Sequence, residues 1–436
     1  MYVCGPTVYN FAHIGNARPP VVFDVLARLL RRSYGLVYVR NVTDVDDKIN
    51  AAAKKEGIDI GVLTSRYLDA FHEDMAALGV LPPDIEPRVT EHLPEIIDLI
   101  ARLVESGCAY EAEGHVLFSV ESFPDYGALS GRNQEELIAG ARVEVAPYKR
   151  APADFVLWKP SDENVVGWDS PWGRGRPGWH VECSTMVESH LGETIDIHGG
   201  GQDLVFPHHE NEAAQSTCAH QGRPYCRHWV HNGLIHVESE KMSKSLGNVL
   251  LLRDLLREAP GEVVRLGLLT AHYRQPLDWT HRVLTEAQQK LDRMYGALRD
   301  AGISGPQQPP ADEPPAAVVE ALEDDLNTPR ALAELFALAR ESNRTRDPAR
   351  RLETAGSLRA GGWLLGLLQG DPQAWFLSGR SHGGLADEQI NALVAKRESM
   401  RQQKRFAEAD HIREELSREG VVIEDSSAGS RWRRSR

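Results

Sequence analysis

The sequence predicts an α/β protein whose N-terminal part contains a parallel sheet and whose C-terminal part is mainly helical. Three observations lead to this prediction. A strand, a helix and a second strand follow one another within residues 1–42, helical patterns dominate after about residue 250, and apolar residues make up 42% of the 436 residues. A chain of this length is expected to form two or three domains.

The N-terminal unit is predicted in detail from its apolar pattern. Residues 1–7 form a short buried strand, and the helix that follows is capped by Asn16 and ends at Gly35. Residues 37–42 form the second buried strand. Because a strand–helix–strand crossover makes the two strands parallel, a ligand is expected beyond their carboxyl ends, close to residues 7–16 and to the segment after residue 42.

The rest of the chain divides into segments of different composition. In order these are an amphipathic helix at 91–106, an insertion of short strands and loops at about 108–180, a second α/β segment at about 180–250, helical segments, a Pro-rich linker at 304–310, a Gly/Ser-rich break at 378–384, two charged helices, and the apolar segment 421–423.

Composition excludes several classes of protein. The five cysteines are scattered and odd in number, so a disulfide framework is excluded and a reducing, cytoplasmic compartment is expected. No apolar run is long enough to cross a membrane, and no secretory signal precedes the first strand. The net charge of −14 argues against indiscriminate nucleic-acid binding, but local basic patches can still bind nucleic acid.

Two short motifs contain residues suited to phosphate chemistry. His13-Ile14-Gly15-Asn16 lies at the turn between the first strand and its helix, where glycine permits close approach and a helix N-terminus favours phosphate. By itself this match is short, and a loop histidine is more often structural. Lys241-Met242-Ser243-Lys244-Ser245 places two ammonium groups beside small residues, which suits a loop that neutralises charge on a triphosphate; the alternative is a solvated basic loop.

The motif at 13–16 precedes the motif at 241–245, with more than two hundred residues between them. In this order and with this separation, they resemble the HIGH and KMSKS motifs of class I aminoacyl-tRNA synthetases. The fourth position of the first motif is Asn16 instead of histidine. Because an amide also donates hydrogen bonds, Asn16 is interpreted as a variant that keeps the function. The resemblance assigns catalysis to His13, Asn16, Lys241 and Lys244, and ATP binding to these four together with Gly15 and Ser243.

A dispersed set of metal-binding residue types forms a third element. Cys4 follows the first strand, Cys183 lies in a segment beginning Gly178-Trp179, and the i, i+4 spacing puts His208 and Glu212 on one helical face. Two thiolates, an imidazole and a carboxylate are a suitable Zn²⁺ set. Spacing alone leaves open the alternative that the cysteines are small core residues.

The segments around these residues resemble cysteinyl-tRNA synthetases specifically, over essentially the whole chain. The resembling segments are 1–9, 41–48, those containing Trp179 and His208, 324–329 and 407–413. The resemblance implies zinc at Cys4, Cys183, His208 and Glu212, and a cysteine pocket lined by Thr43, Trp179 and His198. It also implies Mg²⁺ with ATP, and ATP, L-cysteine and tRNA(Cys) as substrates of a monomer.

The same resemblance implies three domains. These are a Rossmann-type catalytic domain at 1–295 with a connective insertion at about 90–180 and the KMSKS loop at 241–245, a helical bundle at 296–378, and a small α+β anticodon-binding domain at 379–436. Within the last domain, Arg431, Trp432 and Arg433 are predicted to contact tRNA, with the indole stacked on an unpaired base. A frayed charged tail is the alternative interpretation of this patch.

The expected reaction is attack of the cysteine carboxylate on the α-phosphorus of ATP, followed by transfer of cysteine to tRNA. Two rival functions stay open. One is the related ligase that joins cysteine to an amino sugar in mycothiol synthesis, and the other is a non-catalytic tRNA-binding paralogue. Because a zinc ligand three residues from a free terminus would fray, the native chain is also predicted to start upstream of Met1. The alternative is that neighbouring strands anchor Cys4 and that the chain starts at Met1.

Overall fold

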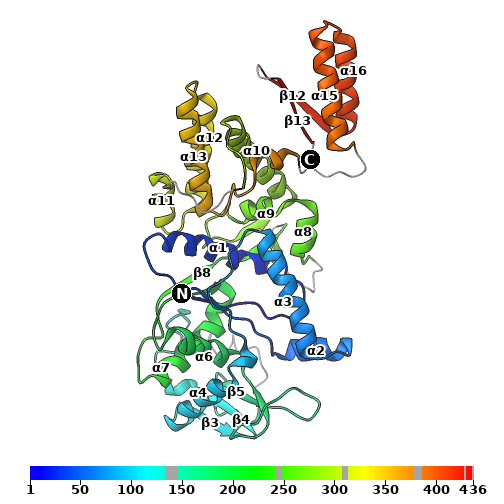
Figure 1. Cartoon of the computed structure of the whole chain (residues 1–436). Helices are drawn as coiled ribbons and strands as arrows, with labels where there is room; N and C mark the ends of the chain where they lie inside the picture. Colours follow the sequence, from blue (N-terminus) through cyan, green and yellow to red (C-terminus); the bar gives the residue numbers. More distant parts are fainter. Residues whose placement is uncertain are drawn as a thin grey trace. The chain divides into compact units, whose positions relative to one another are not determined.

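The computed structural model describes residues 1–132, 146–238, 240–241, 248–306, 313–377, 385–426 and 429–434. The chain forms two compact units (Figure 1). The first comprises Met1–Ala287 with Ala321–Pro329, and the second comprises Gln288–Glu320 with Arg330–Arg436.

A four-stranded parallel sheet forms the centre of the first unit. Its order is β2-β1-β7-β8, with the bounds β1 (Tyr2–Val3), β2 (Val39–Arg40), β7 (Ile195–Gly201) and β8 (Cys226–Asn232). The predicted parallel pairing of the first two strands is therefore confirmed.

Helix α1 (Ile14–Leu30) connects β1 to β2 and packs on the sheet. Phe23 lies so close to β7 that a Cβ on Gly199 would come within 2.2 Å of its ring, so only glycine fits there. The helix ends at Leu30, before the predicted Gly35, and the second strand covers Val39–Arg40 instead of the predicted residues 37–42.

The N-terminus of α1 also differs from the prediction. His13, rather than Asn16, is the N-cap residue, and Asn16 lies one turn inside the helix. The Asn16 Oδ1 atom accepts a hydrogen bond from the His13 N–H at 3.1 Å. Asn16 therefore contributes to the cap from the third helical position, by accepting the N–H of the N-cap residue, and not as the N-cap residue that the sequence predicted.

An antiparallel sheet forms the insertion, as its short apolar runs predict. Its strands follow the order β3-β4-β5-β6, with the bounds β3 (Ala109–Ala112), β4 (His115–Phe118), β5 (Phe155–Pro160) and β6 (Gly175–Pro177). Helix α4 (Leu93–Glu105) packs against β3, α6 (Trp179–Leu191) and α7 (Glu210–Ala219) (Figure 1). The predicted helix at 91–106 is thus confirmed to within two residues.

The remaining elements of the first unit surround these two sheets. They are α2 (Asp47–Glu56), α3 (Ile60–Ala77), the three-stranded sheet of β9 (Ile235–Val237), β10 (Glu240–Lys241) and β11 (Leu277–Trp279), α8 (Leu252–Glu258) and α9 (Gly261–Leu268).

A buried ionic cluster ties α1 to α9. Asp24 accepts a hydrogen bond from the Arg28 Nε at 2.8 Å and another from Arg265, and its second oxygen accepts the Leu81 N–H at 3.0 Å. None of the three charged side chains is more than 4% exposed. The cluster therefore fixes the helix that begins at His13.

Among its described residues, the second unit is helical except for one hairpin. Its elements are α10 (His281–Asp300, which starts in the first unit), α11 (Ala316–Glu323, which ends in the first unit), α12 (Thr328–Arg344), α13 (Pro348–Leu364), α14 (Pro372–Leu377), α15 (Asp387–Gln402), α16 (Phe406–Arg418), β12 (Val421–Ser426) and β13 (Gly429–Arg434). The two charged helices α15 and α16 lie side by side, as Figure 1 shows, and the hairpin packs on them.

Candidate active site

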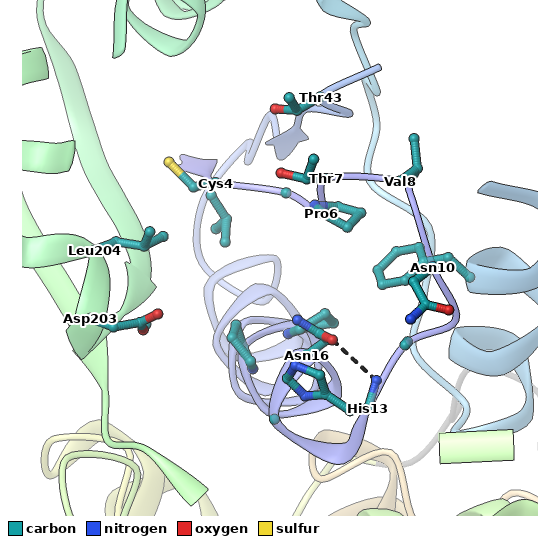
Figure 2. A pocket seen from close by; sticks show the side chains of 18 of the residues that line it. Cys4, Pro6, Thr7, Val8, Asn10, His13, Asn16, Thr43, Asp203 and Leu204 are labelled. Carbon is teal, nitrogen blue, oxygen red and sulfur yellow. Dashed lines mark hydrogen bonds between the residues drawn. The ribbon is translucent and has the colours of Figure 1, made fainter. Parts of the chain in front are cut away.

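A pocket of about 560 Å³ opens at the carboxyl ends of the parallel strands, where the sequence predicts a ligand. It is lined by the segment after β1, the N-terminus of α1, the end of β7 and the turn after β8. In Figure 2, the Cys4 sulfur and Thr43 lie toward one end of this pocket, and His13 and Asn16 lie toward the other. The topology of the sheet thus brings both ends of the predicted site into one cavity.

Four side chains converge at the Cys4 end of the pocket. The donor atoms of Cys4, Cys183, His208 and Glu212 all lie within 4.8 Å of one another. The two sulfur atoms are 3.8 Å apart, and the His208 Nε2 atom lies 3.0 Å from Glu212 Oε1. The four residues that the sequence singled out as a metal set are therefore brought together by the fold.

Local structure explains how each donor reaches this point. Cys4 follows β1, whose neighbours β2 and β7 hold it on both sides. Cys183 lies in the second turn of α6, and α6 packs on α7. His208 precedes α7 and Glu212 lies in its first turn, so that they share one face as the spacing predicts.

Three of the four donor side chains are buried and that of Cys4 is partly buried, and each of the four changes the pKa of its neighbours. Burial raises the pKa of Glu212, but His198 and His208 outweigh it and hold that pKa well below its usual range. Burial lowers the pKa of His208, yet Glu212 and Cys183 raise it to about 10. A hydrogen bond with Cys4 lowers the pKa of Cys183 to about 6, whereas burial raises the pKa of Cys4. The site thus favours a thiolate at Cys183 and a carboxylate at Glu212.

A layer of histidines surrounds these donors: the sequence predicted His198 only as part of the cysteine pocket, and it did not single out His180 and His209. His209 and His198 form a second donor set with Cys4 and Glu212, and the Cys4 sulfur lies 3.4 Å from His209 Nε2 and 3.6 Å from His198 Nε2. His180 contacts His208 through their Nδ1 atoms at 3.0 Å. Burial lowers the pKa of His180 to about 3 and that of His209 well below its usual value, so both rings are neutral.

Two of the three residues predicted to bind cysteine line the pocket. Thr43 is buried, and its hydroxyl donates to Glu182 at 3.4 Å. Trp179 begins α6, is 41% exposed and stacks on His208 with ring centroids 4.3 Å apart. His198 is completely buried, and its Nε2 lies 3.4 Å from Glu212 Oε2. His198 thus lies against the donor cluster.

The first of the two predicted phosphate motifs lies at the other end of the pocket. His13, Gly15 and Asn16 line it, and the dipole of α1 gives this end a partial positive charge. The side chain of Lys241 and residues 242–247, which include Ser243 and Lys244, lie outside the described residues.

The two stems of the KMSKS segment are nevertheless described, and both lie beside the pocket. On the N-terminal side, Lys241 pairs with His236 in the hairpin of β9 and β10. On the C-terminal side, Leu252 N donates to Ala12 O at 2.9 Å, and Ile14 N donates to Leu250 O at 3.0 Å. The fold therefore places the residues on both sides of 242–247 beside the cavity that the His13 motif lines.

The structure corrects the predicted role of Trp432. Its ring is 6% exposed, packs in the core of the α15–α16–β12–β13 segment, and donates from Nε1 to Asn391 Oδ1 at 2.7 Å. Because the indole is buried in this core, it cannot stack on a base of tRNA. Arg431 is exposed, with Asp300 at 3.6 Å, and the side chain of Arg433 lies outside the described residues.

Comparison with known proteins assigns the chain to a family. The family model for the class I (C) tRNA synthetase catalytic domain matches residues 1–289. A cysteine–tRNA ligase of Parvibaculum lavamentivorans is 60% identical over 434 residues, which cover 99% of this chain and 92% of that protein. The chain belongs to the cysteine–tRNA ligase family.

Other comparisons agree with this family. A cysteine–tRNA ligase of Xanthomonas campestris is 56% identical over 436 residues and covers 100% of this chain and 94% of that protein. Models for the DALR domain and for the cysteinyl-tRNA ligase anticodon-binding domain match residues 317–369 and 384–433. The resemblance inferred from the motifs, the predicted fold class and the predicted class of enzyme are thereby confirmed.

Two solved structures share the fold of this chain at low sequence identity. A methionyl-tRNA synthetase of Mycobacterium tuberculosis superimposes with a TM-score of 0.58 at 16% identity, covering 84% of this chain and 89% of that one. A putative arginyl-tRNA synthetase of Campylobacter jejuni gives a TM-score of 0.55 at 14% identity, covering 84% of this chain and 93% of that one.

Within the described residues, no helix combines the length and the apolar character that a bilayer span requires.

Proposed function

We propose that this chain activates L-cysteine with ATP to form cysteinyl-adenylate and pyrophosphate, and then transfers cysteine to tRNA(Cys). We further propose that Zn²⁺, held by Cys4, Cys183, His208 and Glu212, binds the substrate thiolate and selects cysteine. The observation that supports this proposal best is one pocket with a buried sulfur-containing donor set at one end and the helix N-terminus of the His13 motif at the other.

The donor set suits zinc better than other common ions. Two sulfurs, one imidazole nitrogen and one carboxylate oxygen form a mixed set that zinc accepts, whereas Mg²⁺ and Ca²⁺ prefer oxygen ligands alone. Second contacts orient the donors: Tyr225 donates to Glu212 Oε2 at 2.8 Å, and His180 contacts His208. The alternative set replaces Cys183 and His208 by His198 and His209, and it contains only one sulfur. We therefore favour the set with two sulfurs.

The proposed selection of cysteine follows from the chemistry of this set. When bound, zinc supplies a Lewis-acidic centre that binds a thiolate well and a serine hydroxyl poorly. Cys4, Cys183 and His208 line the pocket, so their donor atoms face the space that a substrate side chain would enter. Thr43 and Trp179 line the same region and would hold the rest of the amino acid. Selection of this kind needs no editing site.

The other end of the pocket would hold ATP. The positive end of the α1 dipole favours phosphate, His13 offers an imidazole, and Asn16 keeps its amide nitrogen as a donor because its oxygen is bonded to His13 N. Gly15 permits close approach of the nucleotide. We propose that Lys241, Ser243 and Lys244 complete this site and that Mg²⁺ bridges the phosphates.

The anticodon-binding part supports tRNA as the acceptor. The match at 384–433 argues against the mycothiol-type ligase, which has no use for such a domain. We propose that Arg431 and Arg433 contact the tRNA backbone, and that the three-domain division at 295 and 378 is correct. The cytoplasmic location and the monomeric state remain predictions.

A cysteine-dependent ATP–pyrophosphate exchange assay tests the proposal. Wild-type protein should exchange pyrophosphate with cysteine but not with serine, should charge tRNA(Cys), and should contain one zinc per chain. Cys183→Ser should lose both zinc and exchange, because a thiolate ligand becomes a neutral oxygen. The matched control is Cys226→Ser, whose sulfur contacts the carbonyls of Asp196 and His228 on the sheet, and it should keep both.

Three outcomes would contradict parts of the proposal. Unaltered zinc content in Cys183→Ser would show that the metal site is misplaced. Ligation of cysteine to an amino sugar without tRNA would favour the rival ligase. A wild-type protein that binds tRNA but shows no exchange would be a non-catalytic paralogue.

A further inference from the structure

One buried cation in α1 has no assigned role. Arg18 lies two residues after Asn16, is 1% exposed, and its guanidinium donates to four main-chain carbonyls. The Nη1 atom donates to Gly233 O at 2.7 Å and Leu234 O at 2.9 Å, and Nη2 donates to His272 O at 3.3 Å and Gln275 O at 2.7 Å. Arg18 thus joins two loops that are far apart in the sequence.

These two loops pack tightly against each other. One lies between β8 and β9, and the other precedes β11, which pairs in parallel with β9. Gly233 N donates to Tyr273 O at 2.7 Å, and a Cβ on Gly233 would come within 2.5 Å of Gln275 O. The guanidinium lies where the two loops meet, so both depend on it for their position relative to α1.

One of these loops forms a wall of the pocket. Gly233, Leu234 and Ile235 line it together with His13 and Asn16. The loop leads into β9, and β9 pairs with β10, at whose end the KMSKS segment begins. Arg18 therefore couples the helix of the first motif to the wall and strand that lead to the second.

Stability by itself does not explain a charged side chain at this position. The other buried arginines of this region, Arg28 and Arg265, are paired with Asp24, whereas among the described residues Arg18 forms no salt bridge. Burial lowers the pKa of Arg18 to about 10, so the side chain is still charged at neutral pH. Burying an unpaired charge is costly, and an apolar side chain of similar size often serves stability as well. What an apolar side chain cannot do is bind four main-chain carbonyls at once, and the guanidinium of Arg18 holds these four carbonyls in one fixed geometry.

We propose that Arg18 is a positioning residue for ATP. It holds the wall formed by Gly233, Leu234 and Ile235 at a fixed distance from the start of α1, so that the nucleotide enters a preformed cleft. The inference rests on the proposed function, because it takes this end of the pocket to be the ATP site. A residue that acts in this way affects ATP more than cysteine, whose proposed position is at the zinc end.

The test compares Arg18→Met and Arg18→Lys with wild-type protein in ATP–pyrophosphate exchange. Loss of charged hydrogen bonds should raise the KM for ATP about tenfold or more. The KM for cysteine and the zinc content should stay close to the wild-type values. Lysine keeps the charge but cannot span both loops, so Arg18→Lys should recover only part of the ATP affinity.

Arg28→Lys is the matched control. Arg28 lies in the same helix, is 4% exposed, and donates to a main-chain carbonyl, that of Gly79, at 2.9 Å. Unlike Gly233 and Leu234, which accept from Arg18, the Arg28 partners Gly79 and Asp24 do not line the pocket. This variant should lower the melting temperature while leaving the KM for ATP unchanged. An equal rise in the KM for ATP in Arg28→Lys would show a general loss of structure and would overturn the inference.

The remaining outcomes separate the inference from the proposed function. An unchanged KM for ATP in the Arg18 variants, with an active wild type, would overturn the role of Arg18 alone. A wild-type protein without cysteine-dependent exchange would overturn the proposed function first. If Arg18→Met does not fold, Arg18→Lys decides by itself, since it retains the charge and most of the volume.

Discussion

The hydrogen bond from Tyr225 to Glu212 offers a sharp test of the proposed metal site. The Tyr225 hydroxyl lies 2.8 Å from Glu212 Oε2, and both side chains are buried. Burial raises the pKa of Tyr225 well above its usual value, so the hydroxyl keeps its proton and remains a donor. Tyr225→Phe removes this donor and keeps the ring, and thus perturbs the orientation of a proposed ligand without removing the ligand.

Two independent estimates give the size of the effect. A hydrogen bond to an ionised group contributes about 1.5–3 kcal/mol. Loss of an outer contact to a metal ligand typically lowers metal affinity about 10–100-fold, which corresponds to about 1.4–2.8 kcal/mol. Because the estimates agree, we expect the zinc dissociation constant of Tyr225→Phe to rise by one to two orders of magnitude.

The assay is zinc transfer to a chromogenic chelator, combined with the KM for cysteine in pyrophosphate exchange. Tyr110→Phe is the control, since the Tyr110 hydroxyl donates to another buried carboxylate, Asp154, at 2.6 Å in the insertion sheet. It should lower stability without changing zinc affinity. Equal zinc affinity in wild-type protein and Tyr225→Phe would refute the reasoning, and so would an equal loss in both variants.

Three further predictions follow from other parts of the chain. Asp24→Asn should destabilise the first unit by about 3–5 kcal/mol in thermal or urea unfolding, because Arg28 and Arg265 would keep buried charges without their carboxylate. Burial raises the pKa of Asp24, but the charges of Arg265 and Arg28 outweigh burial and lower that pKa in the folded protein. The contribution of Asp24 to folding stability is therefore complete above the ordinary aspartate pKa, and it is lost as the pH falls through the lowered pKa of the folded protein. Lys244→Ala should slow adenylate formation about 100-fold or more and spare cysteine affinity, and weakened cysteine binding at a normal rate would contradict this. Deleting residues 385–436 should spare exchange and impair tRNA charging, since the segment has its own core; undiminished charging would assign it to folding or solubility.

Local patterns were sufficient for much of the fold. A regular apolar pattern marks the first strand, the helix beginning near His13 and the second strand. A strand–helix–strand crossover of this kind has one strongly preferred geometry, with the two strands parallel. The i, i+4 spacing likewise put His208 and Glu212 on one face before the rest of the site was known. Element ends were less accurate: the helix after His13 stops at Leu30, and residues 31–33 form a turn before Gly35 is reached.

Trp432 shows how composition misleads when register is ignored. An indole among arginines is typical of nucleic-acid contacts, and the sequence analysis interpreted it so. In β13, however, side chains alternate between two faces, and Trp432 pairs with Ile423 of β12. Its face is the apolar one, in contact with the helices, while Arg431 points to the other side and is exposed. The register of the hairpin decides which residue meets solvent.

The sequence by itself determined the family, the class of fold and the residues of the proposed metal set, because these depend on short motifs in a set order. Only the tertiary structure placed His180, His198 and His209 around that set and Arg18 between two pocket loops. These contacts join elements that lie up to hundreds of residues apart, and no local spacing encodes them. They follow from the sheet order β2-β1-β7-β8, which brings the ends of distant strands to one edge.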